Sequence, residues 1–237
     1  MAYALARYAA EGVWVARIDP DAYHAALPDI QGQGMAEMLA AGGWLMLPIA
    51  ICSVLGLAIV IERVWALRAQ RIAPPPLLEQ REQLARSPAL SSADRQSLEA
   101  HSPLGRVWAA VVATRAESTD IRRERIEEAG RQAGHDMARY LNTLGTIAAI
   151  TPLLGLLGTV AGMIRIFATM TETGLGDAQA LAGGIGQALV TTAAGLCVAI
   201  PALVAYRYFN GLVEKRGLLL EQWAVRLIED QRDTPHS

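Results

Sequence analysis

Three long apolar segments limit what this chain can fold into. They cover residues 43–61, 144–164 and 185–206, and none of them contains an Asp, Glu, His, Lys or Arg residue. About 20 helical residues, each rising about 1.5 Å, cross the roughly 30 Å hydrocarbon layer of a bilayer. We therefore expect an all-α integral membrane bundle with three transmembrane helices.

Small residues in the second segment indicate that its helix packs closely against another helix. Gly155, Gly158 and Gly162 lie at three- and four-residue steps, and the last two form a GxxxG pair. This spacing lets membrane helices approach each other backbone to backbone. Pro152 and Pro201 each free a helix carbonyl from its usual donor, and neighbouring helices of a bundle can satisfy such a group.

Basic residues are distributed unevenly around the three segments. Residues 62–140 contain thirteen Arg, and five Lys or Arg follow the third segment. The part before the first segment has two Arg, and the link between the second and third has one. By the positive-inside rule, the N-terminus lies outside, and both the large loop and the C-terminus lie in the cytoplasm.

The regions outside the apolar segments are also expected to be helical. Ser102 followed by Pro103 is typical of an N-cap with a proline in the first helical turn. Apolar residues at helical spacing continue from Ile126 to Leu144 without a break signal, so we expect one helix that runs into the second span. A similar stripe extends beyond the third span to Leu227.

These signals divide the chain into parts, and two of the three transmembrane helices extend far into the cytoplasm. The expected parts are an N-terminal tail over 1–38, transmembrane helix 1 over 39–66, a cytoplasmic helical loop over 67–119, a long helix with transmembrane helix 2 over 120–172, a periplasmic turn over 173–177, transmembrane helix 3 with a cytoplasmic extension over 178–230, and a C-terminal tail over 231–237.

The N-terminal tail leaves two alternatives open. It lacks the charged start and the continuous apolar core of a signal peptide. It is either an extracytoplasmic tail or not native, because Met35 leads directly into the first span and is an alternative start to Met1.

The spans contain polar side chains but no Asp, Glu, His, Lys or Arg residue. Thr159 lies in the second span, and Gln187, Thr191 and Thr192 lie in the third. A membrane Thr hydroxyl either bonds to a carbonyl of its own helix or faces a polar lumen that several helices share. We take these four residues as candidates for a pore lining or proton pathway. A proton relay needs a titratable group, which here would have to come from another chain.

Several function classes are disfavoured. The net charge of −2 argues against a nucleic-acid partner. Cys52 and Cys197 each lie in an apolar span and fit packing better than a disulfide or a metal site. The glycines of 155–162 lack the lysine of a phosphate loop, and no nucleophile–base pair stands out, so neither an enzyme nor a bound cofactor is expected.

The motifs of the second and third spans resemble those of a known family. Residues 141–148 read LNTLGTIA, residues 151–160 read TPLLGLLGTV, and residues 183–196 read GGIGQALVTTAAGL. They are similar to motifs of the MotA/TolQ/ExbB proton-channel proteins. The match is to ExbB and TolQ more than to MotA, which has four spans, and it covers about 36–230.

The resemblance implies a homopentamer in the bacterial inner membrane that encloses a dimer of a single-span ExbD- or TolR-like partner. In the family, a membrane Asp of the partner carries the proton, and the threonines that match Thr159 and Thr192 line its surroundings. Gly195 belongs to the third-span motif and joins the helix-packing residues. Proton flow then drives a TonB- or TolA-like protein, and the implied role is to energise TonB-dependent outer-membrane transport.

One position departs from the family pattern. Some ExbB and TolQ proteins carry a Glu at the position of Gln187, whose amide cannot titrate although it donates and accepts hydrogen bonds. This departure puts proton transfer on the partner. The sequence leaves open a TolQ-like role in envelope integrity and a passive membrane scaffold without ion flux.

Overall fold

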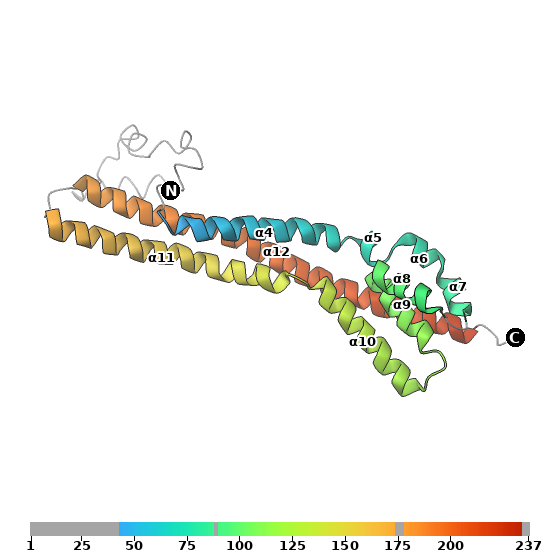
Figure 1. Cartoon of the computed structure of the whole chain (residues 1–237). Coiled ribbons are helices and arrows are strands. Elements are labelled where there is room, and N and C mark those ends of the chain that lie inside the picture. The colour runs from blue at the N-terminus through green and yellow to red at the C-terminus, as the bar shows by residue number, and fades with distance from the viewer. Residues whose placement is uncertain (1–42, 88–89, 174–177, 234–237) are drawn as a thin grey trace, which may run out of the picture. The chain divides into compact units, whose positions relative to one another are not determined.

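The computed structural model describes residues 43–87, 90–173 and 178–233, and this part of the chain contains helices and no strands (Figure 1). The expected tail over 1–38, the choice between Met1 and Met35, and the turn at 174–177 lie outside these residues. Three helices are long and apolar enough to cross a membrane. The expected all-α membrane fold is therefore confirmed.

The three membrane-spanning helices are α4 (Met46–Ala66), α11 (Leu141–Thr173) and α12 (Ala178–Asp233). Figure 1 shows α11 and α12 running alongside each other over most of the length of α11, and α4 contacts both of them. The apolar side chains that point away from this packing are exposed, for example Leu153, Leu189 and Val204 at 62%, 63% and 65%. Such surfaces suit contact with lipid or with other transmembrane helices.

The third span continues without interruption into an extramembrane extension. The helix α12 has 56 residues and passes through Pro201. At about 1.5 Å per residue it is roughly 84 Å long, far more than a bilayer requires. Residues 178–230, predicted as transmembrane helix 3 with an extension, lie within this helix.

Shorter helices fill the region between α4 and α11. They are α5 (Ala69–Ile72), α6 (Pro75–Glu79), α7 (Arg81–Arg86), α8 (Ser92–His101), α9 (Pro103–Ala113) and α10 (Thr119–Met137). The predicted start of α9 is confirmed, because the Ser102 hydroxyl accepts a hydrogen bond from the Gly105 amide at 3.0 Å and Pro103 occupies the first turn. This cap satisfies one of the backbone donors that a helix start leaves open.

In place of the single helix expected over 120–172, the structure has α10 and α11 with a break at 138–140 (Figure 1). Tyr140 adopts a φ of 62°, which lies in the left-handed region. An L residue there costs roughly 1–2 kcal/mol, and the helix cannot continue through it. The apolar stripe gave no hint of the break because Met137, Leu141 and Leu144 are buried on both sides of it.

Most residues of the buried core cluster lie outside the three apolar segments. Trp108 of α9 is fully buried, its ring meets that of Trp223 edge to face with centroids 6.4 Å apart, and its Nε1 donates to the Trp223 carbonyl at 3.2 Å. Leu220 and Leu227 of α12 belong to the same cluster. This core fixes the extramembrane helices onto the extension of α12.

Candidate functional site

The interface between α11 and α12 depends on small residues at regular intervals. A Cβ atom on Gly155 would lie 3.0 Å from Thr192 Cα, one on Gly158 would lie 2.7 Å from Thr191 Cβ, and one on Gly162 would lie 3.0 Å from Ala188 Cβ. These are shorter than ordinary van der Waals contacts. The glycines of the second span therefore allow a close approach of the two helices.

The third span contributes one glycine to the same contact. A Cβ atom on Gly195 would lie 2.8 Å from the Thr151 carbonyl oxygen and 3.2 Å from Gly155 Cα. Gly195 and Gly155 thus face each other across the helix pair. The two predicted prolines, Pro152 and Pro201, lie within α11 and α12 without ending either helix.

Threonine hydroxyls are held by backbone carbonyls in this region. Thr192 Oγ1 donates to the Gly155 carbonyl at 3.0 Å, which is a hydrogen bond between the two helices. Thr159 Oγ1 donates to the Leu156 carbonyl at 2.7 Å within its own helix. In both cases the hydroxyl proton is donated, and the oxygen keeps lone pairs that can accept a hydrogen bond.

The candidate lining residues differ in exposure. Thr159 and Thr192 are half-buried, so part of each side chain reaches the surface of the subunit. Thr191 is only 1% exposed, and its hydroxyl bonds to the Gln187 carbonyl at 2.8 Å. Its side chain occupies the space into which a Cβ atom on Gly158 would point. Thr191 therefore packs α11 against α12 within one subunit.

Gln187 lies toward the end of the interface that contains Arg165 of α11. Its Oε1 is 3.5 Å from Arg165 Nη1, a long hydrogen bond between α12 and α11. Its Nε2 lies beside Gly43, where a Cβ atom would be only 2.6 Å away, and Gly43 has a φ of 71°. Gln187 of the third span thus lies beside the start of the first span and the end of the second apolar segment.

The helices that form this interface are similar to those of known proteins. Residues 99–222, more than half of the chain, match the MotA/TolQ/ExbB proton channel family. The ExbB-like 1 biopolymer transport protein of Synechocystis is 37% identical over 182 residues, which is 72% of this chain and 68% of that protein. The chain belongs to the MotA/TolQ/ExbB proton channel family.

Other relatives of this family member carry similar names. The ExbB-like 3 protein of Synechocystis is 31% identical over 185 residues, which is 77% of this chain and 88% of that protein. The biopolymer transport protein ExbB of Neisseria gonorrhoeae is 46% identical over 70 residues, which is 30% of this chain and 32% of that protein. The expected resemblance to ExbB is confirmed.

One buried arginine of this ExbB-like chain was not predicted from the sequence as a site residue. Arg63, near the end of α4, is only 3% exposed and donates to the Met137 carbonyl at 2.9 Å, at the end of α10. It also pairs with Glu62, and its guanidinium carbon lies 5.6 Å from the centre of the Tyr140 ring. The sequence shows two adjacent charged residues, Glu62 and Arg63, at the end of an apolar span. It does not show that Arg63 contacts the end of α10.

A second missed residue is Arg115, at the far end of the extramembrane helices. Its Nη1 donates to the Ala85 carbonyl at 3.0 Å and its Nη2 to the Gln231 carbonyl at 3.4 Å, at the ends of α7 and α12. A cation is favourable at helix C-termini. Arg122 bonds to the Gln231 side chain at 2.5 Å, and burial together with the charges of Arg232 and Arg115 lowers the pKa of its guanidinium.

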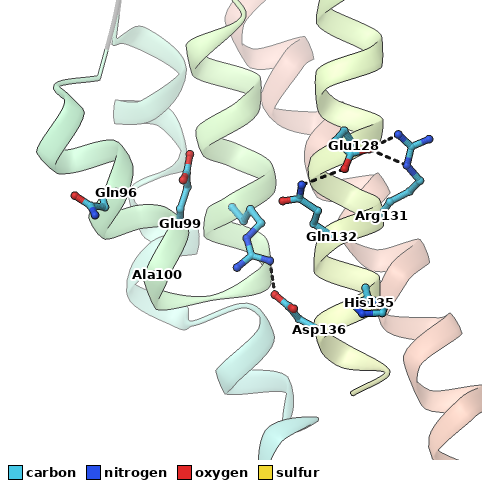
Figure 2. A pocket seen from close by; sticks show the side chains of 9 residues that line it. Gln96, Glu99, Ala100, Glu128, Arg131, Gln132, His135 and Asp136 are labelled. Carbon is cyan, nitrogen blue, oxygen red and sulfur yellow. Dashed lines mark hydrogen bonds and ion pairs between the residues drawn. The ribbon is translucent and has the colours of Figure 1, made fainter. Parts of the chain in front are cut away.

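One pocket among the extramembrane helices is lined by charged side chains that form ion pairs. It has a volume of about 800 Å³ and lies between α8, α9 and α10 (Figure 2). Arg106 pairs with Asp136, and Glu128 pairs with Arg131 and accepts a hydrogen bond from Gln132 at 3.0 Å. In the part of the chain that the structure describes, no group of three His, Cys, Asp or Glu side chains is placed to hold a metal ion.

Proposed function

We propose that this chain is the channel-forming subunit of an ExbB-type motor in the bacterial inner membrane. In this proposal it uses the proton motive force to energise TonB-dependent transport across the outer membrane. The observation that carries the proposal is the polar but uncharged character of the spans, where half-buried Thr159 and Thr192 are available and no acid is present. The names of the relatives, biopolymer transport protein ExbB, support the same process.

The proton carrier in this proposal is an Asp from a second protein. Five copies of the chain enclose a dimer of a single-span ExbD- or TolR-like partner, and a TonB- or TolA-like protein receives the work. The acceptor lone pairs of Thr159 and Thr192 stabilise the protonated form of that Asp, and Gln187 does not titrate. A lone Asp at a helix centre costs about 2.5–3.5 kcal/mol, and polar surroundings lower this cost.

The proposed orientation follows the basic residues. The N-terminus lies in the periplasm, and the extramembrane helices α5–α10 and the C-terminus lie in the cytoplasm, where positively charged loops are retained. This supports a motor whose large domain is on the cytoplasmic side.

Proton flux through reconstituted vesicles tests the lining role. The complex with its partner is placed in vesicles under a membrane potential, and the flux is compared for wild type, Thr159→Val and Thr192→Val. Because Val keeps the shape of Thr and removes the hydroxyl, we expect each substitution to lower the flux severalfold while the oligomer persists. Thr146→Val is the matched control, since Thr146 is exposed and bonds within its own helix at 2.9 Å. Equal flux in all four proteins would argue against the lining role.

Native mass spectrometry of the complex, extracted gently from its own membranes, separates the alternatives. Five copies of the chain with two of a small single-span protein are expected, and sequencing the partner distinguishes an ExbB-like from a TolQ-like system. A homo-oligomer without a partner, together with no proton flux, would favour a passive membrane scaffold.

A further inference from the structure

A cluster of Trp and Arg side chains lies where the first span ends. Trp65 is the next-to-last residue of α4 and is 57% exposed. Ile61 and Val64, just before it, are 58% and 49% exposed, so this part of α4 presents an apolar surface up to its last turn. A Trp at such a position sits at the level of the lipid headgroups, because its ring is apolar and its N–H is polar.

Two arginines are held over this tryptophan. The guanidinium carbons of Arg68 and Arg71 lie 5.7 Å and 5.4 Å from the centre of the Trp65 ring. Both side chains are exposed. These contacts keep both guanidinium groups close to the Trp65 ring at the end of the helix.

These two arginines differ from many others outside the spans. Arg81, Arg86, Arg95, Arg106, Arg123, Arg125 and Arg131 each form an ion pair with an Asp or Glu. Among the described residues, no carboxylate pairs with Arg68 or Arg71. Within the described part of the chain, the cluster therefore carries two positive charges that no ion pair neutralises, at the end of an apolar span.

We propose that Trp65, Arg68 and Arg71 bind the phosphate headgroup of an anionic phospholipid. A guanidinium group matches the geometry of a phosphate with two parallel hydrogen bonds, and two such groups favour a headgroup with a net negative charge. Arg71 also lines a pocket of about 400 Å³ with Gln70, His101 and Asp136, which offers room and polar groups for the rest of a headgroup. The negative charge of Asp136 is paired with Arg106. The inference does not depend on the proposed proton channel.

Lipid retention in native mass spectrometry tests this site. The purified full chain is offered an equimolar mixture of phosphatidylglycerol and phosphatidylcholine with the same acyl chains, and the ratio of retained lipids is measured. We expect wild type to retain phosphatidylglycerol preferentially. Arg68→Gln with Arg71→Gln should reduce this preference by about fivefold for each arginine.

The matched control removes the same charge elsewhere. Arg86→Gln with Arg95→Gln affects two ion-paired arginines of the extramembrane helices and should leave the lipid ratio unchanged. If the double variant at Arg68 and Arg71 loses its helical circular dichroism, Trp65→Leu serves in its place, because it removes the stacking and keeps the charges and an apolar side chain. Trp65→Leu should also lower the preference.

Three results would overturn the proposal. Wild type could retain both lipids equally, or the variant and control pairs could behave alike. Free glycerol phosphate at millimolar concentration could displace phosphatidylglycerol, which would show that the cluster recognises soluble phosphate rather than a membrane lipid.

Discussion

At the scale of single residues, the interface of α11 and α12 has glycines at several positions where the other helix comes close. Gly155 faces Gly195, and Gly158 faces Thr191. The Thr192 hydroxyl then bonds across the interface to the Gly155 carbonyl. Because apolar side chains gain little from leaving lipid for each other, close packing and such hydrogen bonds must hold the two spans together.

Adding one methyl group at this contact should destabilise the helix pair. In Gly158→Ala the new Cβ would collide with the side chain of Thr191, which is β-branched and fully buried. We expect a loss of about 1–3 kcal/mol, the usual cost of overpacking. Thermal unfolding in detergent, followed by circular dichroism, measures it.

Gly186→Ala provides the control for this substitution, since nothing lies within 4 Å of a Cβ at Gly186. Gly186→Ala should leave the unfolding midpoint unchanged or raise it slightly, because Ala favours helix more than Gly. A midpoint that falls equally in both variants would contradict close packing at Gly158.

At the scale of elements, the break between α10 and α11 is stabilised from another helix. Arg63 of α4 donates to the last carbonyl of α10, and both Arg63 and Arg139 lie over the Tyr140 ring, Arg139 at 4.7 Å. These contacts offset the cost of the left-handed backbone at Tyr140. The first span is thereby tied to the point where the extramembrane helix α10 turns away from the second span.

Two substitutions at Tyr140 distinguish a break from a continuous helix. In a continuous helix, Tyr140→Ala is expected to be about 1 kcal/mol more stable than Tyr140→Gly. With a φ of 62° the order reverses, because Gly adopts this backbone without strain and Ala does not. The measurement is the difference between the thermal unfolding midpoints of the two variants. Both variants lack the Tyr ring, so its loss does not affect this difference.

Removing Arg63 should loosen the same junction. Arg63→Met keeps the apolar stem but loses the hydrogen bond to the Met137 carbonyl, and a buried bond of this kind is worth about 1–3 kcal/mol when its partner is left unsatisfied. We expect faster amide hydrogen exchange over 134–144, with amides of α12 near Leu220 as an internal reference. Unchanged exchange at the junction would mean that Arg63 does not hold it.

At the scale of the whole described region, the extramembrane helices form one core with the extension of α12. Trp108 links α9 to Trp223, and Arg115 links the ends of α7 and α12. Motion of the third span would therefore be transmitted to these helices as a unit. This arrangement suits a subunit whose spans and large domain act together.

Loss of Arg115 tests that connection. Arg115→Met should lower the unfolding midpoint by several degrees, because carbonyls at two helix ends lose their donor. Arg86→Met removes an ion pair whose two side chains are 70% and 73% exposed, and it should have almost no effect. Equal midpoints for the two variants would show that Arg115 contributes no more than a surface charge.

Much of the candidate site can be proposed from the sequence because its signals are local. The spacing of Gly158 and Gly162 and the hydroxyls of Thr159 and Thr192 are visible in order along the chain. The assignment of Thr191 could not be made in this way. Adjacent threonines on a helix point in different directions, and only the position of α11 shows that Thr191 is buried while Thr192 reaches partly to the surface.

The sequence by itself determined that the chain is helical, that three spans cross a membrane and that the family motifs lie in the second and third spans. Length, hydropathy and glycine spacing decide these features without reference to distant residues. Only the tertiary structure decided where the second long helix ends. The chain at Tyr140 carries no Gly or Pro, and the break is held by Arg63, 77 positions earlier in the sequence, through contacts that no local pattern records.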